Sequence, residues 1–227
     1  RSTLSSSSAA SDVYKRQILC LSLMTGCNTN TLFNLSSQTS ITPDSRAIIP
    51  NKNIIIQAPD GFCLDETVSD TSSKSPFLLF GNCAAISQSN SVTQSKVYAV
   101  LTAAISKEKS KNGPFNGKQL DGYLRSENGK STLSFSGNSQ DIKVLDSFKM
   151  DDSYFVLVQN IGKRKSNALS SHSWRAYLEI SGYLISLSII GFNQNPMKHD
   201  ESLEIIRHFV NEIRTNNGFK PTSVPIS

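Results

Sequence analysis

The pattern of apolar and polar positions changes along the chain, from short apolar runs and strict alternation to helical spacing near the end. Short β-branched or apolar runs predict strands at 53–57, 62–65 and 77–80, with a Pro-Asp-Gly turn at 59–61 between the first two. The run 97–105 predicts a further strand, although its alanines also suit a helix. We therefore expect this part of the chain to supply short strands.

Two hairpins are predicted further along the chain. Segments 141–148 and 154–159 flank the turn-like tetrapeptide 149–152, and apolar residues on both faces of the second segment indicate a central strand. Apolar residues then alternate over 174–189 on either side of Ser181-Gly182, which is the pattern of a tight hairpin. These hairpins indicate an antiparallel sheet.

Helical spacing occurs at two places. Apolar residues at i, i+3 and i+4 within 117–129 predict a short helix that ends near Gly129. The same spacing over 200–217 predicts a longer amphipathic helix, with Asp200 as its N-cap and Gly218 just past its end.

The order of these elements predicts an α+β fold. We expect an antiparallel sheet with hairpins packed against an internal short helix and a C-terminal amphipathic helix. A chain of 227 residues suits one domain, which the pattern places at 51–218, followed by a disordered tail at 219–227.

The N-terminal residues have a different character. RSTLSSSSAASDVYKRQ, residues 1–17, resembles the translated sequence of a library adapter and is therefore predicted to be non-native, a disordered Ser-rich tail being the alternative. Residues 18–26 contain an apolar run too short to cross a bilayer, which needs about 20 residues. They are predicted to be a truncated lipoprotein signal.

A cysteine follows this run. Met24-Thr25-Gly26-Cys27 resembles the lipobox of bacterial lipoproteins, in which the cysteine is lipidated. Residues 27–50 are polar and without periodicity, which predicts a flexible tether. For the apolar run 18–24 and Cys27, the alternative is a short buried strand with an incidental cysteine. Lipidation of Cys27 predicts a periplasmic protein anchored in a membrane, and Asn28 slightly favours the outer membrane.

The remaining cysteines agree with export. Cys20 lies in the predicted signal and Cys27 is the predicted lipidation site, so Cys63 and Cys83 remain as a pair that an oxidising periplasm would join. The alternative, a nucleophilic or metal-binding thiol, lacks a neighbouring histidine or CxxC spacing.

Two resemblances add to these expectations. PDGFCLD and SPFLLFGNCAAIS, which contain Cys63 and Cys83, resemble a family of uncharacterised alphaproteobacterial lipoproteins. The last 55 or so residues, with SGYLISLSIIGF followed by ESLEIIRHFVNEIR, resemble the end of the PsbP and Mog1-like sandwiches in pattern. Neither resemblance implies an active site.

No sequence motif for catalysis was found. The GxSxG, phosphate-loop, GxGxxG and HExxH patterns are absent, so no catalytic residue, cofactor or metal site is predicted. The net charge of +5 falls to about +3 without residues 1–26, which is too mild for nucleic-acid binding.

The leading hypothesis is a lipid-anchored periplasmic binding module whose partner is an envelope protein or a small ligand. One alternative is a hydrolase or transferase that uses His172, expected in the polar loop 166–173, with an acid from the loop 65–70. Another alternative is a structural envelope component.

Overall fold

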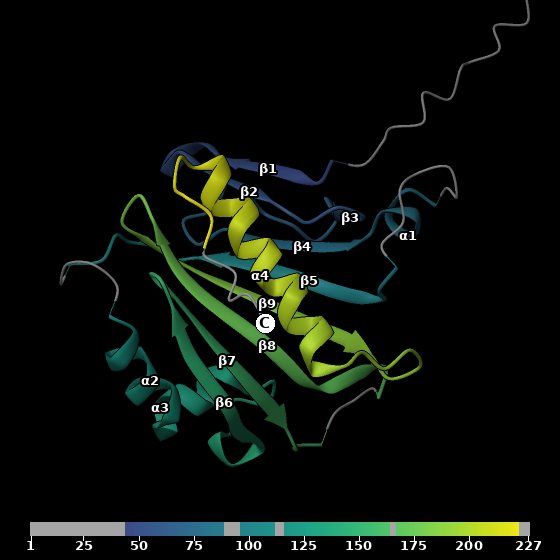
Figure 1. Cartoon of the computed structure of the whole chain (residues 1–227), viewed down its shortest axis with the longest axis vertical. Helices are drawn as coiled ribbons and strands as arrows, with labels where there is room; N and C mark the ends of the chain where they lie inside the picture. The colour runs from purple at the N-terminus through teal and green to yellow at the C-terminus, as the bar shows by residue number, and fades with distance from the viewer. Residues whose placement is uncertain (1–43, 89–95, 112–115, 164–166, 223–227) are drawn as a thin grey trace, which may run out of the picture. The chain divides into compact units, whose positions relative to one another are not determined.

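The computed structural model describes residues 44–88, 96–111, 116–163 and 167–222, which belong to the compact unit Ser40–Ser227 (Figure 1). The strands are β1 (Arg46–Ile49), β2 (Ile54–Gln57), β3 (Phe62–Leu64), β4 (Phe77–Asn82), β5 (Ala99–Ile105), β6 (Ile142–Met150), β7 (Ser153–Asn160), β8 (Leu169–Ile180) and β9 (Tyr183–Phe192). The helices are α1 (Cys83–Ser87), α2 (Gly117–Arg125), α3 (Glu127–Leu133) and α4 (His199–Asn216), with 3₁₀ turns η1 (Pro50–Lys52) and η2 (Ser139–Asp141).

Seven strands form one antiparallel sheet in the order β3-β4-β5-β9-β8-β7-β6, and β1 and β2 form a separate antiparallel pair. The predicted α+β class is therefore confirmed. β7 lies between β6 and β8 and is buried on both faces, as its two-sided apolar pattern predicted. The β8–β9 hairpin turns at Ser181 and Gly182, which both adopt positive φ (53° and 84°) as a type I′ turn requires.

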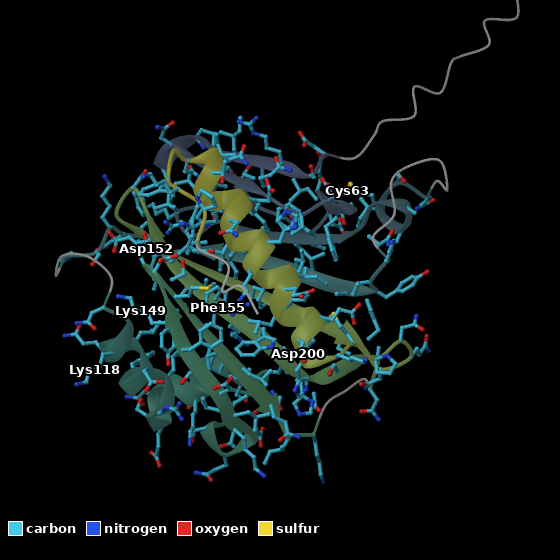
Figure 2. The ribbon with its side chains drawn as sticks, viewed as in Figure 1. Cys63, Lys118, Lys149, Asp152, Phe155 and Asp200 are labelled. Atoms are coloured by element: carbon cyan, nitrogen blue, oxygen red, sulfur yellow. A yellow bond between two sulfur atoms is a disulfide. The ribbon has the colours of Figure 1, made fainter. Side chains whose placement is uncertain are left out.

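The main core lies between the sheet and α4, which crosses β8 and β9 (Figure 1). Ile206, Phe209, Val210 and Ile213 of α4 are fully buried, and Leu203 is partly buried. The ring of Phe209 meets that of Phe80 edge-on at 5.7 Å between centroids. Each such side chain contributes about 1.5–3 kcal/mol by leaving water. Asp200 is not the N-cap as predicted: Lys198 is, and Asp200 lies in the first turn (Figure 2), where its charge complements the helix dipole.

A second core covers part of the opposite face of the sheet. Leu124 of α2 and Leu133 of α3 pack there against Tyr154, Val156 and Tyr177. The predicted single helix ending near Gly129 is wrong. The break falls at Ser126, whose Oγ accepts the Gly129 N–H at 3.2 Å and begins α3.

The predicted domain limits were too narrow at both ends. Residues 46–49, assigned to the tether, form β1, which pairs with β2 and buries Ala47 and Ile49. In the predicted tail, Thr222 is buried, and both its N–H and its hydroxyl donate to Asn211 Oδ1. The predicted adapter, the signal and Cys27 lie outside the described residues.

Asn217 connects the end of α4 to the β1–β2 pair. Its side-chain oxygen accepts the Ile55 N–H at 3.0 Å, and its side-chain nitrogen donates to the Ile55 carbonyl at 2.7 Å. The Asn217 amide thus makes the same pair of hydrogen bonds to Ile55 that the backbone of a neighbouring strand would make. The short β1–β2 pair thus gains a polar link to α4 in addition to its apolar contacts.

Candidate functional site

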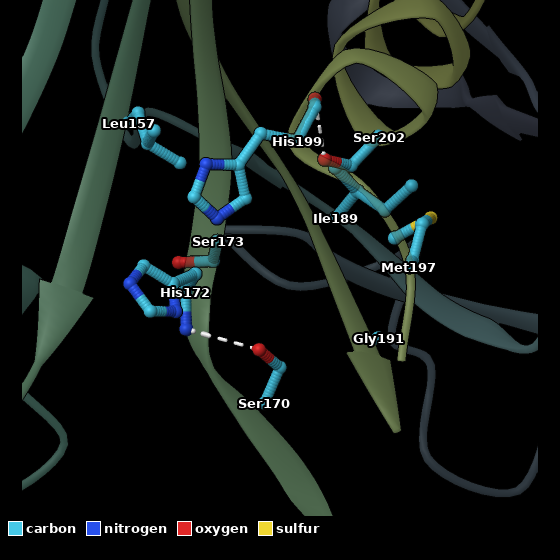
Figure 3. A pocket seen from close by; sticks show the side chains of 9 residues that line it. All are labelled: Leu157, Ser170, His172, Ser173, Ile189, Gly191, Met197, His199 and Ser202. Carbon is cyan, nitrogen blue, oxygen red and sulfur yellow. Dashed lines mark hydrogen bonds between the residues drawn. The ribbon is translucent and has the colours of Figure 1, made fainter. Parts of the chain in front are cut away.

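A small cavity lies where the start of α4 meets β8 and β9 (Figure 3). Its polar lining is Ser170, His172, Ser173, His199 and Ser202. Leu157 and Ile189 supply apolar walls. The cavity has a volume of about 20 Å³, which is enough for one molecule or ion of the size of water.

His172 lies in β8 and not in the loop that the sequence predicted. Its backbone N–H donates to Ser170 Oγ at 3.1 Å, and its Nδ1 lies 3.2 Å from Ser171 Oγ. Residues 170–173 are all polar, so they lack the apolar alternation that identifies a strand. The register of β8 against β9 also shifts between Leu169 and Ser173.

His199 is the first residue of α4, and its backbone carbonyl fixes the start of that helix over the sheet. The carbonyl accepts the Trp174 indole N–H at 3.0 Å and the Ser202 hydroxyl at 2.8 Å. The His199 ring lies next to the His172 ring, with 4.9 Å between centroids and 44° between planes. Nothing in the local sequence predicts this pair, because α4 and β8 meet only in the tertiary structure.

The structure does not bring the acidic loop to His172. Asp65 Oδ1 accepts the Thr67 N–H at 3.0 Å, and Asp70 accepts the N–H groups of Ser72 and Ser73. The hydrogen bonds to Asp70 lower its pKa, and the bond from the Ser72 backbone N–H has the largest effect. The loop follows β3, which three strands separate from β8, so the proposed pairing of His172 with one of these acids is wrong in geometry.

Asp121 is the centre of a polar cluster on the opposite face. It accepts hydrogen bonds from Tyr154, Ser147 and Arg125. The pKa of Tyr154 is raised to about 12, mainly by burial and then by its hydrogen bond to Asp121. The same hydrogen bond lowers the pKa of Asp121. A tyrosine held this firmly protonated is a hydrogen-bond donor and not a base, so the cluster serves to hold α2 on β6 and β7.

Cys63 and Cys83 form a disulfide between β3 and the start of α1, as the count of cysteines predicted. Both residues are buried. The bond therefore fastens a three-residue edge strand to the chain that leaves β4.

Part of the sheet face opposite α4 carries side chains that are partly exposed, most of them small. Leu79, Thr102 and Ser188 lie side by side on β4, β5 and β9, and each keeps part of its surface exposed. The hydroxyls of Thr102 and Ser188 lie 2.6 Å apart. We call these three residues and their neighbours Val100 and Ser186 the open sheet face.

Comparisons with protein-family models, with curated proteins and with solved structures find no match for this chain. The two family resemblances stay predictions. Within the described ranges, no helix has the length and apolar character needed to span a membrane. The same residues contain no group of three or more histidine, cysteine or acidic side chains arranged to hold a metal ion.

Proposed function

We propose that this protein is a binding module of the bacterial envelope, held at a membrane by a lipid on Cys27, which recruits another envelope protein and catalyses no reaction itself. The Cys63–Cys83 disulfide carries the proposal, because structural disulfides persist mainly in oxidising compartments such as the periplasm. The lipobox-like Met24-Thr25-Gly26-Cys27 supports the same location.

The geometry favours a protein partner over a small organic ligand. Pockets for organic ligands have volumes of about 300–1,000 Å³, whereas the cavity beside His172 has about 20 Å³. The open sheet face suits a protein better, because its short side chains at Thr102 and Ser188 let a partner approach the sheet closely.

Lipidation is tested by Cys27→Ala, expressed behind a complete lipoprotein signal and labelled with radioactive palmitate. We expect the variant to lose the label and to leave the membrane fraction. Cys20→Ala is the matched control and is expected to keep both, because Cys20 lies in the part of the signal that is removed. A Cys27→Ala variant that is still labelled would contradict the proposal.

The partner surface is tested by cross-linking in cells followed by mass spectrometry. Thr102→Lys places a charged chain on the open sheet face and is expected to remove a specific cross-linked partner. Thr215→Lys, at an exposed position on α4, makes the same chemical change elsewhere and is expected to keep it. A partner that survives both changes would mean that the open sheet face is not the docking surface.

A further inference from the structure

His172 and His199 come from separate elements and place their imidazole rings side by side at one cavity (Figure 3). We propose that these two rings bind a divalent transition-metal ion of the borderline class, Cu²⁺ or Zn²⁺. The site uses one nitrogen from each ring, and water and neighbouring serine hydroxyls complete the coordination.

The spacing of the rings matches what such an ion requires. A metal–nitrogen bond of about 2.1 Å, with about 1.1 Å more to the ring centre, places each centroid about 3.2 Å from the metal. Nitrogen–metal–nitrogen angles of about 90–110° then separate the centroids by about 4.5–5.2 Å. The observed separation is 4.9 Å. Rotation of a ring about its Cβ–Cγ bond selects the nitrogen that faces the ion and leaves the centroid almost in place.

Both rings are carried by well-anchored backbone. His172 lies within β8, and His199 begins α4, whose start is tied to β8 by the bond from the Trp174 indole to the His199 carbonyl. Ser171 Oγ lies 3.2 Å from His172 Nδ1, within hydrogen-bonding distance of the ring. Such outer hydrogen bonds are typical of histidines that bind metals.

The surroundings fit a hydrated cation. The cavity accepts one water-sized species and offers the hydroxyls of Ser170, Ser173 and Ser202. His199 is exposed, so an ion reaches the pair from solvent. Asp200 and Glu201 in the first turn of α4 add negative charge nearby. Two imidazoles favour Cu²⁺ over Zn²⁺ and bind Mg²⁺ or Ca²⁺ poorly, because those ions prefer oxygen ligands.

The test is isothermal titration of the full chain with CuCl₂ or ZnCl₂ in a non-chelating buffer. The chain carries Cys20→Ser and Cys27→Ser, because free thiols would also bind these ions, so the outcome does not depend on the lipid anchor. Binding of one ion per chain is expected, with Cu²⁺ the tighter. His172→Ala and His199→Ala are each expected to weaken binding by about tenfold or more.

His208→Ala is the matched control because it removes the third histidine of the chain, which pairs with Glu212 at 3.1 Å on α4. It is expected to leave affinity unchanged. The Cu²⁺ electron paramagnetic resonance spectrum should show two coordinated nitrogens, reduced to one by either variant of the pair. Circular dichroism of the metal-free variants checks that they fold. The proposal would be overturned if the unmodified pair bound no metal ion. It would also be overturned if the folded His172→Ala and His199→Ala variants kept the affinity of the unmodified pair.

Discussion

Opening the Cys63–Cys83 disulfide is expected to lower the free energy of unfolding by about 3 kcal/mol at 25 °C. The two residues are 20 positions apart, and the loop-entropy relation gives this value for a closed loop of that length. The effect arises in the unfolded chain, which gains conformations once the loop is open. It is large against the 5–15 kcal/mol or so by which typical domains are stable.

The loss is expected to begin locally at β3. This strand has three residues, lies at the edge of the sheet and pairs there with β4. Phe62 and Leu64 on either side of Cys63 are buried, so fraying of β3 exposes apolar surface. Hydrogen exchange should therefore rise first at β3 and only later in β8 and β9.

The assay is denaturant unfolding of the chain carrying Cys20→Ser and Cys27→Ser. The oxidised protein is compared with its reduced form and with a Cys63→Ala, Cys83→Ala double variant. The reduced form keeps both buried sulfur atoms, so it separates the loop effect from the small cavity that the alanines leave. A difference below about 1 kcal/mol between oxidised and reduced protein would refute the reasoning, as would two free thiols in the intact mass of the oxidised protein.

Two further predictions concern the opposite face of the sheet. Gly129→Ala should destabilise the fold by about 1–3 kcal/mol or more, because the added Cβ would lie 1.9 Å from the Tyr123 carbonyl oxygen. In Gly122→Ala the added Cβ meets nothing within 4 Å, so this control variant should be neutral or stabilising. Thermal unfolding of the two variants tests both expectations. The lowered pKa of Asp121 stabilises the fold above the unfolded value of 3.8, a contribution lost as pH falls through the folded value. The raised pKa of Tyr154, about 12, costs stability as pH rises past 10, where the unfolded tyrosine ionises. Tyr154→Phe should therefore reduce both losses in melting temperatures measured against pH, and an unchanged profile would contradict this account.

The elements with a strong repeating pattern were predicted correctly. The 174–189 hairpin and the C-terminal helix each carry enough buried apolar positions to define their period. β1 was missed because its four residues are too few for a periodic signal, and its pairing with β2 and packing near α4 decide its structure. Gly129 was misread as a helix end because its role, a close approach to the Tyr123 backbone, depends on how α3 folds back on α2.

The candidate site could not be predicted in the same way. The sequence singles out His172 alone, and the residues next to His172 and His199 are mostly polar and show no common spacing. The rings meet because the Trp174 indole binds the His199 carbonyl and places the start of α4 over β8. Contacts between distant segments of this kind depend on the packing of the whole core.

The sequence by itself determined the α+β class, the two hairpins, the final amphipathic helix and the pairing of Cys63 with Cys83. Local periodicity, turn residues and the count of cysteines carry that information, because they act over a few residues or reflect the chemistry of a single residue type. Only the tertiary structure decided the order of the seven strands, the break between α2 and α3, the open sheet face and the meeting of two imidazoles. These features arise from long-range packing, in which each side chain is placed by residues far from it in the chain.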